Sequence, residues 1–179
     1  MVDFVHWITT NRDFITSWTA ILAIVASTVS IAIAVSNMRM QRAHYRKTVM
    51  PFGNLSMGDY ENQLFVRLRN DGVGPMIVDG VSILQNENGA KIGEALIDLM
   101  PRDLLWATFV KNISGRAFAP GKDIDLILFD VDEADPASIA ARQSIRAALS
   151  KLSVKVEYHS IYGEKFLAQR SLDWFGRHA

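Results

Sequence analysis

The most regular pattern in the chain is a long apolar run near its N-terminus. Residues 14–38 contain no Asp, Glu, Lys or Arg, and residues 18–35 hold nothing more polar than Ser and Thr. Roughly 20 apolar residues in a helix cross the hydrocarbon core of a bilayer. The run is too long for a signal peptide, and no basic region precedes it. It therefore predicts one retained transmembrane helix over residues 14–38, with a buried helix of a soluble domain as the other interpretation.

Beyond the apolar run, hydrophobic and polar residues alternate in short segments. This period-two pattern predicts five strands, over residues 63–69, 76–84, 123–129, 153–159 and 165–172. The second strand is interrupted by Asp79 and Gly80, where we expect a bulge or a sharp turn. Short strands separated by turn-forming residues are typical of a β-sandwich. Residues 51–179 are thus predicted to form a mainly-β, sandwich-like soluble domain.

Two helices are expected within this domain. Asp135 followed by Pro136 is typical of a helix N-terminus, and the apolar spacing after it predicts a helix over residues 137–152. Residues 101–111 form a second candidate helix. The predicted fold is therefore a single N-terminal transmembrane helix followed by a sandwich-like domain with one or two inserted helices.

The distribution of charge orients the predicted span. The chain has 19 basic and 19 acidic side chains and no net charge. Residues 1–13 sum to −1, residues 14–58 to +4 and residues 59–179 to −3. Because Lys and Arg accumulate on the cytoplasmic side of a span, the C-terminal side should be cytoplasmic and the N-terminus outside. Residues 39–50 then form a basic juxtamembrane stalk, whose helix should end before Pro51.

The first 13 residues also carry apolar side chains at helical spacing, Phe4, Trp7 and Ile8 among them. Trp is favoured at the membrane interface, so residues 1–13 could form a short interfacial helix. They could equally be the beginning of the span.

Small and hydroxylated residues gather on one side of the predicted span. At 100° per residue, about a third of the circumference contains six candidate pore-lining or helix-packing residues: Thr16, Thr19, Ala23, Ser27, Ser30 and Asn37. Small residues let helices approach closely, and hydroxyls can bond across the contact. Three interpretations remain open, namely a non-conducting homo-oligomer, a narrow pore and a monomeric anchor.

Six basic residues form a second candidate site, for a membrane surface or an anionic ligand. They are Arg39, Arg42, Arg46 and Lys47 in the stalk and Arg67 and Arg69 in the first predicted strand. The ligand could be a nucleotide, an oligonucleotide or lipid headgroups. The other interpretation of Arg67 and Arg69 is an ordinary solvated strand face.

Catalytic chemistry finds no support in the sequence. The chain has no cysteine, its four histidines lie in separate segments, and no P-loop or nucleophile-elbow motif occurs. The acidic loop around Asp132 and Asp135 lacks the central Gly and distal Glu of an EF-hand loop. We therefore predict a non-enzymatic protein with no cofactor and no metal site.

The layout resembles a broad group of small bacterial single-span proteins. The resemblance rests on two segments, "LRNDGVGPMIVDGVSI" and "VKVEYHSIYGEKF". The positions that match the motifs of this group are Asn70, Gly72, Gly74, Pro75, Tyr158 and Gly163. These motifs consist of residues that form turns between strands, so they specify a fold rather than an activity. The layout is also similar to membrane effectors of bacterial anti-phage systems, which implies a location in the bacterial inner membrane.

Together these observations predict a homo-oligomeric membrane protein. In its specific form, a pore of the spans acts in anti-phage defence and is gated by an anionic ligand or partner bound to the cytoplasmic domain. The alternative is a passive anchor or scaffold whose sandwich docks a partner protein.

Overall fold

The structure, a computed structural model, describes residue 10 and residues 12–178, without the side chains at positions 15, 43, 46, 47 and 178. The chain divides into two units, residues 1–47 and residues 48–179, and the second is called the β domain below. The predicted interfacial segment, residues 1–13, lies almost wholly outside the described residues.

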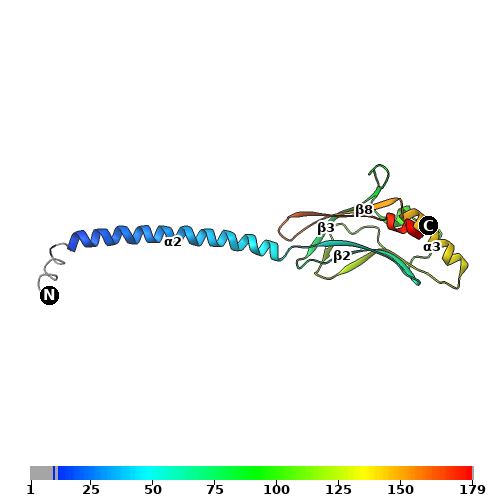
Figure 1. The fold of residues 1–179 in the computed structure, drawn as a ribbon, viewed down its shortest axis with the longest axis horizontal. Helices are drawn as coiled ribbons and strands as arrows, with labels where there is room; N and C mark the ends of the chain where they lie inside the picture. The colour runs from blue at the N-terminus through cyan, green and yellow to red at the C-terminus, as the bar shows by residue number, and fades with distance from the viewer. Residues whose placement is uncertain (1–9, 11, 179) are drawn as a thin grey trace. The chain divides into compact units, whose positions relative to one another are not determined.

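A single long helix, α2 (Arg12–Thr48), includes both the predicted span and the predicted stalk (Figure 1). Its part from Arg12 to Arg42 is long and apolar enough to cross a membrane. At 1.5 Å per residue these 31 residues extend about 46 Å, more than the roughly 30 Å of a hydrocarbon core. The helix ends three residues before Pro51, as expected.

The β domain is built from two antiparallel sheets (Figure 1), and the predicted mainly-β fold is confirmed. One sheet has the order β1-β2-β7-β5, with β1 (Gly53–Asp59), β2 (Gln63–Asn70), β7 (Asp123–Asp130) and β5 (Thr108–Phe109). The other has the order β4-β3-β8-β9, with β4 (Lys91–Gly93), β3 (Met76–Gln85), β8 (Leu152–His159) and β9 (Lys165–Ser171). Strand β6 (Ala117–Phe118) also pairs with β3.

The core lies between the two sheets. Leu64, Val66 and Leu68 of β2 are fully buried, as their alternation predicts. In β8 the alternate residues Val154 and Val156 are fully buried as well. The period-two pattern of these strands therefore indicates which face of each sheet packs against the other sheet.

The helix α3 (Pro136–Leu149) closes one end of the β domain and begins one residue before the predicted range. It ends three residues earlier than predicted, because Leu152 is the first residue of β8. The Asp135 carboxylate accepts hydrogen bonds from the backbone N–H groups of Ala137 and Ser138, at 2.9 and 3.3 Å. Its arginines Arg142 and Arg146 bind the carboxylate of Asp59, whose side chain is 1% exposed, at 2.6 and 2.7 Å. These ion pairs attach α3 to the end of β1.

The prediction of a second helix, over residues 101–111, is wrong. This segment is irregular except for the short strand β5, which lies near its end and pairs with β7. Its side chains Leu104 and Trp106 pack against the core two residues apart, a spacing that suits extended backbone. Two 3-10 helices, η1 (Leu96–Leu99) and η2 (Asp173–His178), were not expected.

Candidate functional site

The residues of the predicted helix-packing stripe are exposed along α2. Three of their hydroxyls bond to the backbone of the same helix: Thr16 to Arg12 O at 2.7 Å, Thr19 to Thr16 O at 2.8 Å and Ser30 to Ala26 O at 2.7 Å. A hydroxyl that donates within its own helix needs no water, so it can lie in hydrocarbon. Ala23, Ser27 and Asn37 complete the stripe.

The basic stalk continues the same helix. Arg39 and Arg42 are exposed, and the side chains of Arg46 and Lys47 lie outside the described part of the chain. Placed just beyond an apolar helix, such residues are suited to anionic headgroups.

Arg67 and Arg69 are engaged by carboxylates of the β domain itself. The guanidinium of Arg67 binds Asp125 at 2.6 Å and Asp123 at 3.4 Å, and the hydrogen bond to Asp125 raises the pKa of Arg67. Arg69 binds Asp71 at 2.9 Å. An anionic ligand at this face would have to displace these carboxylates, so the geometry favours an ordinary strand face.

The motif around Asn70 lies where the chain enters the β domain. Asn70 is fully buried, and its side chain makes four hydrogen bonds. Its amide donates to Gly74 O at 2.8 Å and Phe118 O at 3.1 Å, and its oxygen accepts from Phe52 N and Gly72 N at 3.2 and 3.1 Å. These bonds use both donors and both acceptor positions of the amide. They connect the β2–β3 turn to the segment before β1.

The two glycines of this turn allow a close backbone approach to the same segment. A Cβ on Gly72 would lie 2.3 Å from Phe52 N, and one on Gly74 would lie 1.8 Å from Val49 O. Backbone bonds join the two segments, from Asp71 N to Phe52 O at 2.8 Å and from Val73 N to Met50 O at 3.2 Å. Glycine is therefore required at both positions by space.

Tyr158 completes this arrangement from the second sheet. Its hydroxyl accepts a hydrogen bond from Gly53 N at 2.9 Å, and its ring stacks on Phe166 at 5.6 Å between centroids. Asn70, Gly72, Gly74 and Tyr158 all contact residues 49–53, and we call them the junction clamp. Gly163 lies apart from it in the β8–β9 turn, with a φ of 78° that favours glycine.

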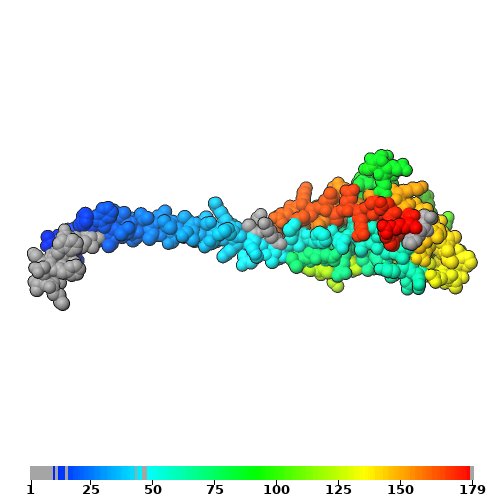
Figure 2. Space-filling model, in the orientation of Figure 1, coloured from blue at the N-terminus to red at the C-terminus, as the bar shows by residue number. Residues whose placement is uncertain are grey.

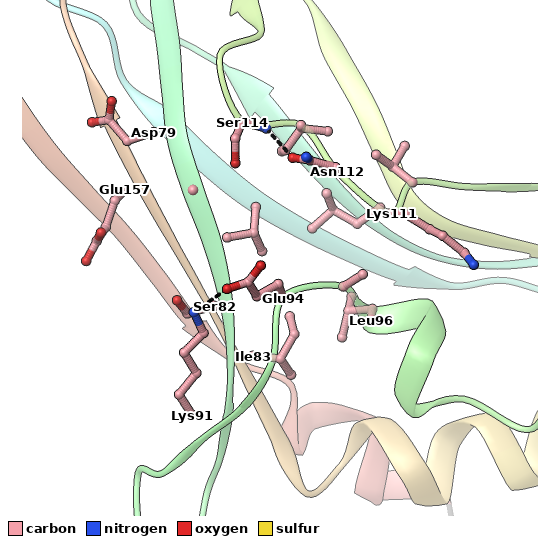
Figure 3. Close-up of a pocket in the computed structure, with 16 residues that line it drawn as sticks. Asp79, Ser82, Ile83, Lys91, Glu94, Leu96, Lys111, Asn112, Ser114 and Glu157 are labelled. Carbon is pink, nitrogen blue, oxygen red and sulfur yellow. Dashed lines mark hydrogen bonds and ion pairs between the residues drawn. The ribbon is translucent and has the colours of Figure 1, made fainter.

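A cavity of about 270 Å³ opens at the edge of β3 (Figure 3). Strand β6 pairs with the first residues of β3 and β4 with the last, so the edge is interrupted between Val78 and Ile83. The register of β3 against β8 shifts at the same place, which confirms the expected bulge at Asp79. Apolar side chains from both sheets, such as Ile83 and Leu126, line its floor.

Charged and polar side chains surround this cavity, and most of the charged ones have partners. Lys91 binds Glu94 at 2.8 Å, and Asp79 binds His159 at 2.7 Å. Glu157 binds Lys155 at 2.7 Å, which lowers the pKa of Glu157. The cavity could therefore hold a small polar ligand. The sequence indicated only its Asp79–Gly80 corner, because β4 and the segment around Asn112 have no regular pattern.

Among residue 10 and residues 12–178, no group of three or more His, Asp or Glu side chains is placed to hold a metal ion. Asp132 and Asp135 of the acidic loop instead accept backbone N–H groups of their own loop and of α3. No family model matches the sequence, and no curated protein is significantly similar to it.

Proposed function

We propose that this protein is a non-enzymatic, homo-oligomeric membrane protein whose β domain controls the packing of its membrane-spanning helices. The span is the apolar part of α2, residues 14–38, and the basic residues that follow it, Arg39, Arg42, Arg46 and Lys47, face the cytoplasm. The β domain is then cytoplasmic and the N-terminus outside, in the inner membrane of a bacterium.

The stripe on α2 supports association of the spans. Thr16, Thr19 and Ser30 donate their hydrogen bonds within the helix, so the stripe is a smooth, small-residue surface. A helix surrounded by lipid has no need to place such residues on one side. In a helix–helix contact, small residues on one side let the two backbones approach closely. Each hydroxyl oxygen can still accept a further bond across the contact.

The junction clamp is the observation that carries the proposal. Only residues 49–52 lie between the end of α2 at Thr48 and the start of β1 at Gly53. The clamp bonds this short segment to both sheets of the β domain. A ligand or partner that shifts the sheets would thus act on the residues that continue into α2, because no free linker intervenes.

In its most specific form, the spans conduct ions and the protein is a toxic effector of anti-phage defence. The gating ligand is an anionic molecule or a partner protein bound to the β domain. The stripe residues Thr19, Ser27, Ser30 and Asn37 then face the lumen.

Ion flux in liposomes tests this form with the full chain. We expect flux from the parent and loss of flux from Thr19→Leu and Ser30→Leu. Gly74→Ala, which disturbs the clamp, should change the flux, and Gly93→Ala should not, because a Cβ on Gly93 would meet its nearest neighbour, a side-chain carbon of Leu99, at 3.5 Å.

Two other outcomes would replace this form. Cross-linked oligomers without flux would leave a non-conducting assembly. If oligomers are absent as well, and induction of the protein leaves growth and membrane potential normal, the protein is a passive anchor that docks a partner.

A further inference from the structure

The segments that surround the chain entry lie at one end of the β domain. Gly53 pairs with Asn70, Gly121 N bonds Asn70 O, and Ile77 pairs with His159. Residues 49–53, 71–75, 119–122 and 160–164 therefore share this end, which we call the entry end. The β8–β9 turn (orange) forms one tip of the β domain in Figure 2, and α3 (yellow) lies at the other.

The entry end carries large apolar side chains in loops that are otherwise made of turn residues. Their exposed fractions are 43% for Met50, 61% for Phe52, 66% for Val73, 53% for Ile161 and 48% for Tyr162. Surface turns usually carry polar residues. The turn residues that pack closely against residues 49–52 are Gly72 and Gly74, whereas Val73 between them is exposed.

Chain connectivity identifies the surface that these side chains meet. Val49 lies seven positions beyond Arg42, the last residue of the part of α2 that is long and apolar enough to cross a membrane. This length is about 10 Å as helix and at most about 25 Å fully extended. The entry end is therefore always held close to the headgroups of the bilayer that α2 crosses, at a high effective concentration.

The chemistry of the entry end suits that surface. Tyr162 has an aromatic ring with a polar tip, which is favoured at the membrane interface. Lys122 and Lys165 are exposed beside the turns that carry the apolar side chains. They can bind lipid phosphates while Val73 and Ile161 enter the acyl boundary.

We propose that the entry end of the β domain docks on the bilayer surface, with Val73, Ile161 and Tyr162 inserted at headgroup level. This inference rests on the proposed membrane span. Docking would hold the β domain against the membrane and add a second attachment to the junction clamp.

Fluorescence quenching in vesicles tests the docking directly. The chain has no cysteine, so a single introduced cysteine can be labelled without background. Full-length Val73→Cys and Tyr162→Cys are labelled with bimane in phosphatidylcholine–phosphatidylglycerol vesicles that contain a lipid with a nitroxide high on its acyl chain. Tyr60→Cys is the matched control, because Tyr60 is 58% exposed in the turn at the other end of β1. Ile24→Cys reports on the span itself.

We expect strong quenching at Ile24, and quenching at Val73 and Tyr162 that is roughly threefold or more that at Tyr60. If the label at position 24 is quenched but the quenching at positions 73 and 162 equals that at position 60, the docking proposal is wrong and the proposed span is supported. If Ile24 is not quenched, the proposed span fails, and docking fails with it. Disulfide cross-links between copies at Val73 without lipid quenching would overturn docking in favour of a contact between two β domains.

Discussion

The hydroxyl of Tyr158 accepts a hydrogen bond from the backbone N–H of Gly53, 105 residues earlier in the chain, at 2.9 Å. Both groups are buried. This bond joins β8 of one sheet to the first residue of β1 in the other, immediately after α2 and its four-residue connection. The end of the sandwich that receives the chain is thus fixed by side chains from both sheets.

Removing this hydroxyl should destabilise the β domain without enlarging any side chain. Tyr158→Phe leaves the buried N–H of Gly53 without its acceptor, which costs about 1–3 kcal/mol. Urea unfolding followed by circular dichroism measures the loss. Tyr60→Phe, at an exposed tyrosine, should leave the midpoint unchanged, and an equal loss in both variants would contradict this role of Tyr158.

Gly74→Ala should be among the most damaging single-methyl changes in the domain. Its Cβ would lie 1.8 Å from the backbone oxygen of Val49, and backbone on both sides must move to relieve the clash. We expect a loss of at least about 2–3 kcal/mol in unfolding free energy. Gly80→Ala adds the same methyl in open space and should be neutral or slightly stabilising. Similar midpoints for both alanine variants would refute the close approach.

Asn70→Asp should make stability depend on pH. The aspartate keeps the acceptor facing Phe52 N and Gly72 N but loses both N–H donors, and a buried carboxylate then faces the carbonyls of Gly74 and Phe118. Burial raises the pKa of such a carboxyl above its unfolded value. The folded state therefore binds the proton more tightly, and the unfolding free energy of the variant falls as pH rises above about 4.

The measurement is the difference in unfolding free energy between Asn70→Asp and the parent at several pH values. We expect this difference to be smallest near pH 4 and largest at neutral pH. A difference that does not vary with pH would show that position 70 is open to water.

Asp59→Asn should loosen α3 from the sheet. The carboxylate of Asp59 forms ion pairs with both Arg142 and Arg146, whose side chains are only 15% and 11% exposed. Breaking a buried ion pair by removing one partner costs about 3–5 kcal/mol. Amide hydrogen exchange should show faster exchange in α3 first. Glu94→Gln, which removes a partner of Lys91 whose side chain is 77% exposed, should leave stability unchanged.

The sequence predicted the elements whose residues keep one period throughout. The apolar run from Phe14 to Met38 and the alternation of Leu64, Val66 and Leu68 correctly indicated a long helix and a buried strand face. The Asp135–Pro136 signal placed the start of α3 within one residue. These patterns are local, so no partner strand is needed to recognise them.

The missed elements depend on distant partners. Strand β1 contains Gly53, Gly58 and several polar residues, and it is extended because all seven of its residues pair with β2. The segment before β5 has the composition of a helix, but pairing with β7 keeps its end extended. The junction clamp combines Asn70 with Tyr158, which lie 88 positions apart. Its motif was visible in the sequence, but its contact with residues 49–53 was not.

Disulfide cross-linking of the spans tests the central claim, that the protein is an oligomer packed through the stripe on α2. Ser30 lies on the stripe, and Thr28 lies about 160° away around the helix. Both hydroxyls bond to their own backbone, at 2.7 and 2.9 Å, so Ser30→Cys and Thr28→Cys are closely matched changes. In membranes under mild oxidation, we predict a high yield of covalent dimer for Ser30→Cys and little for Thr28→Cys. Equal yields, or a higher yield for Thr28→Cys, would contradict packing through the stripe.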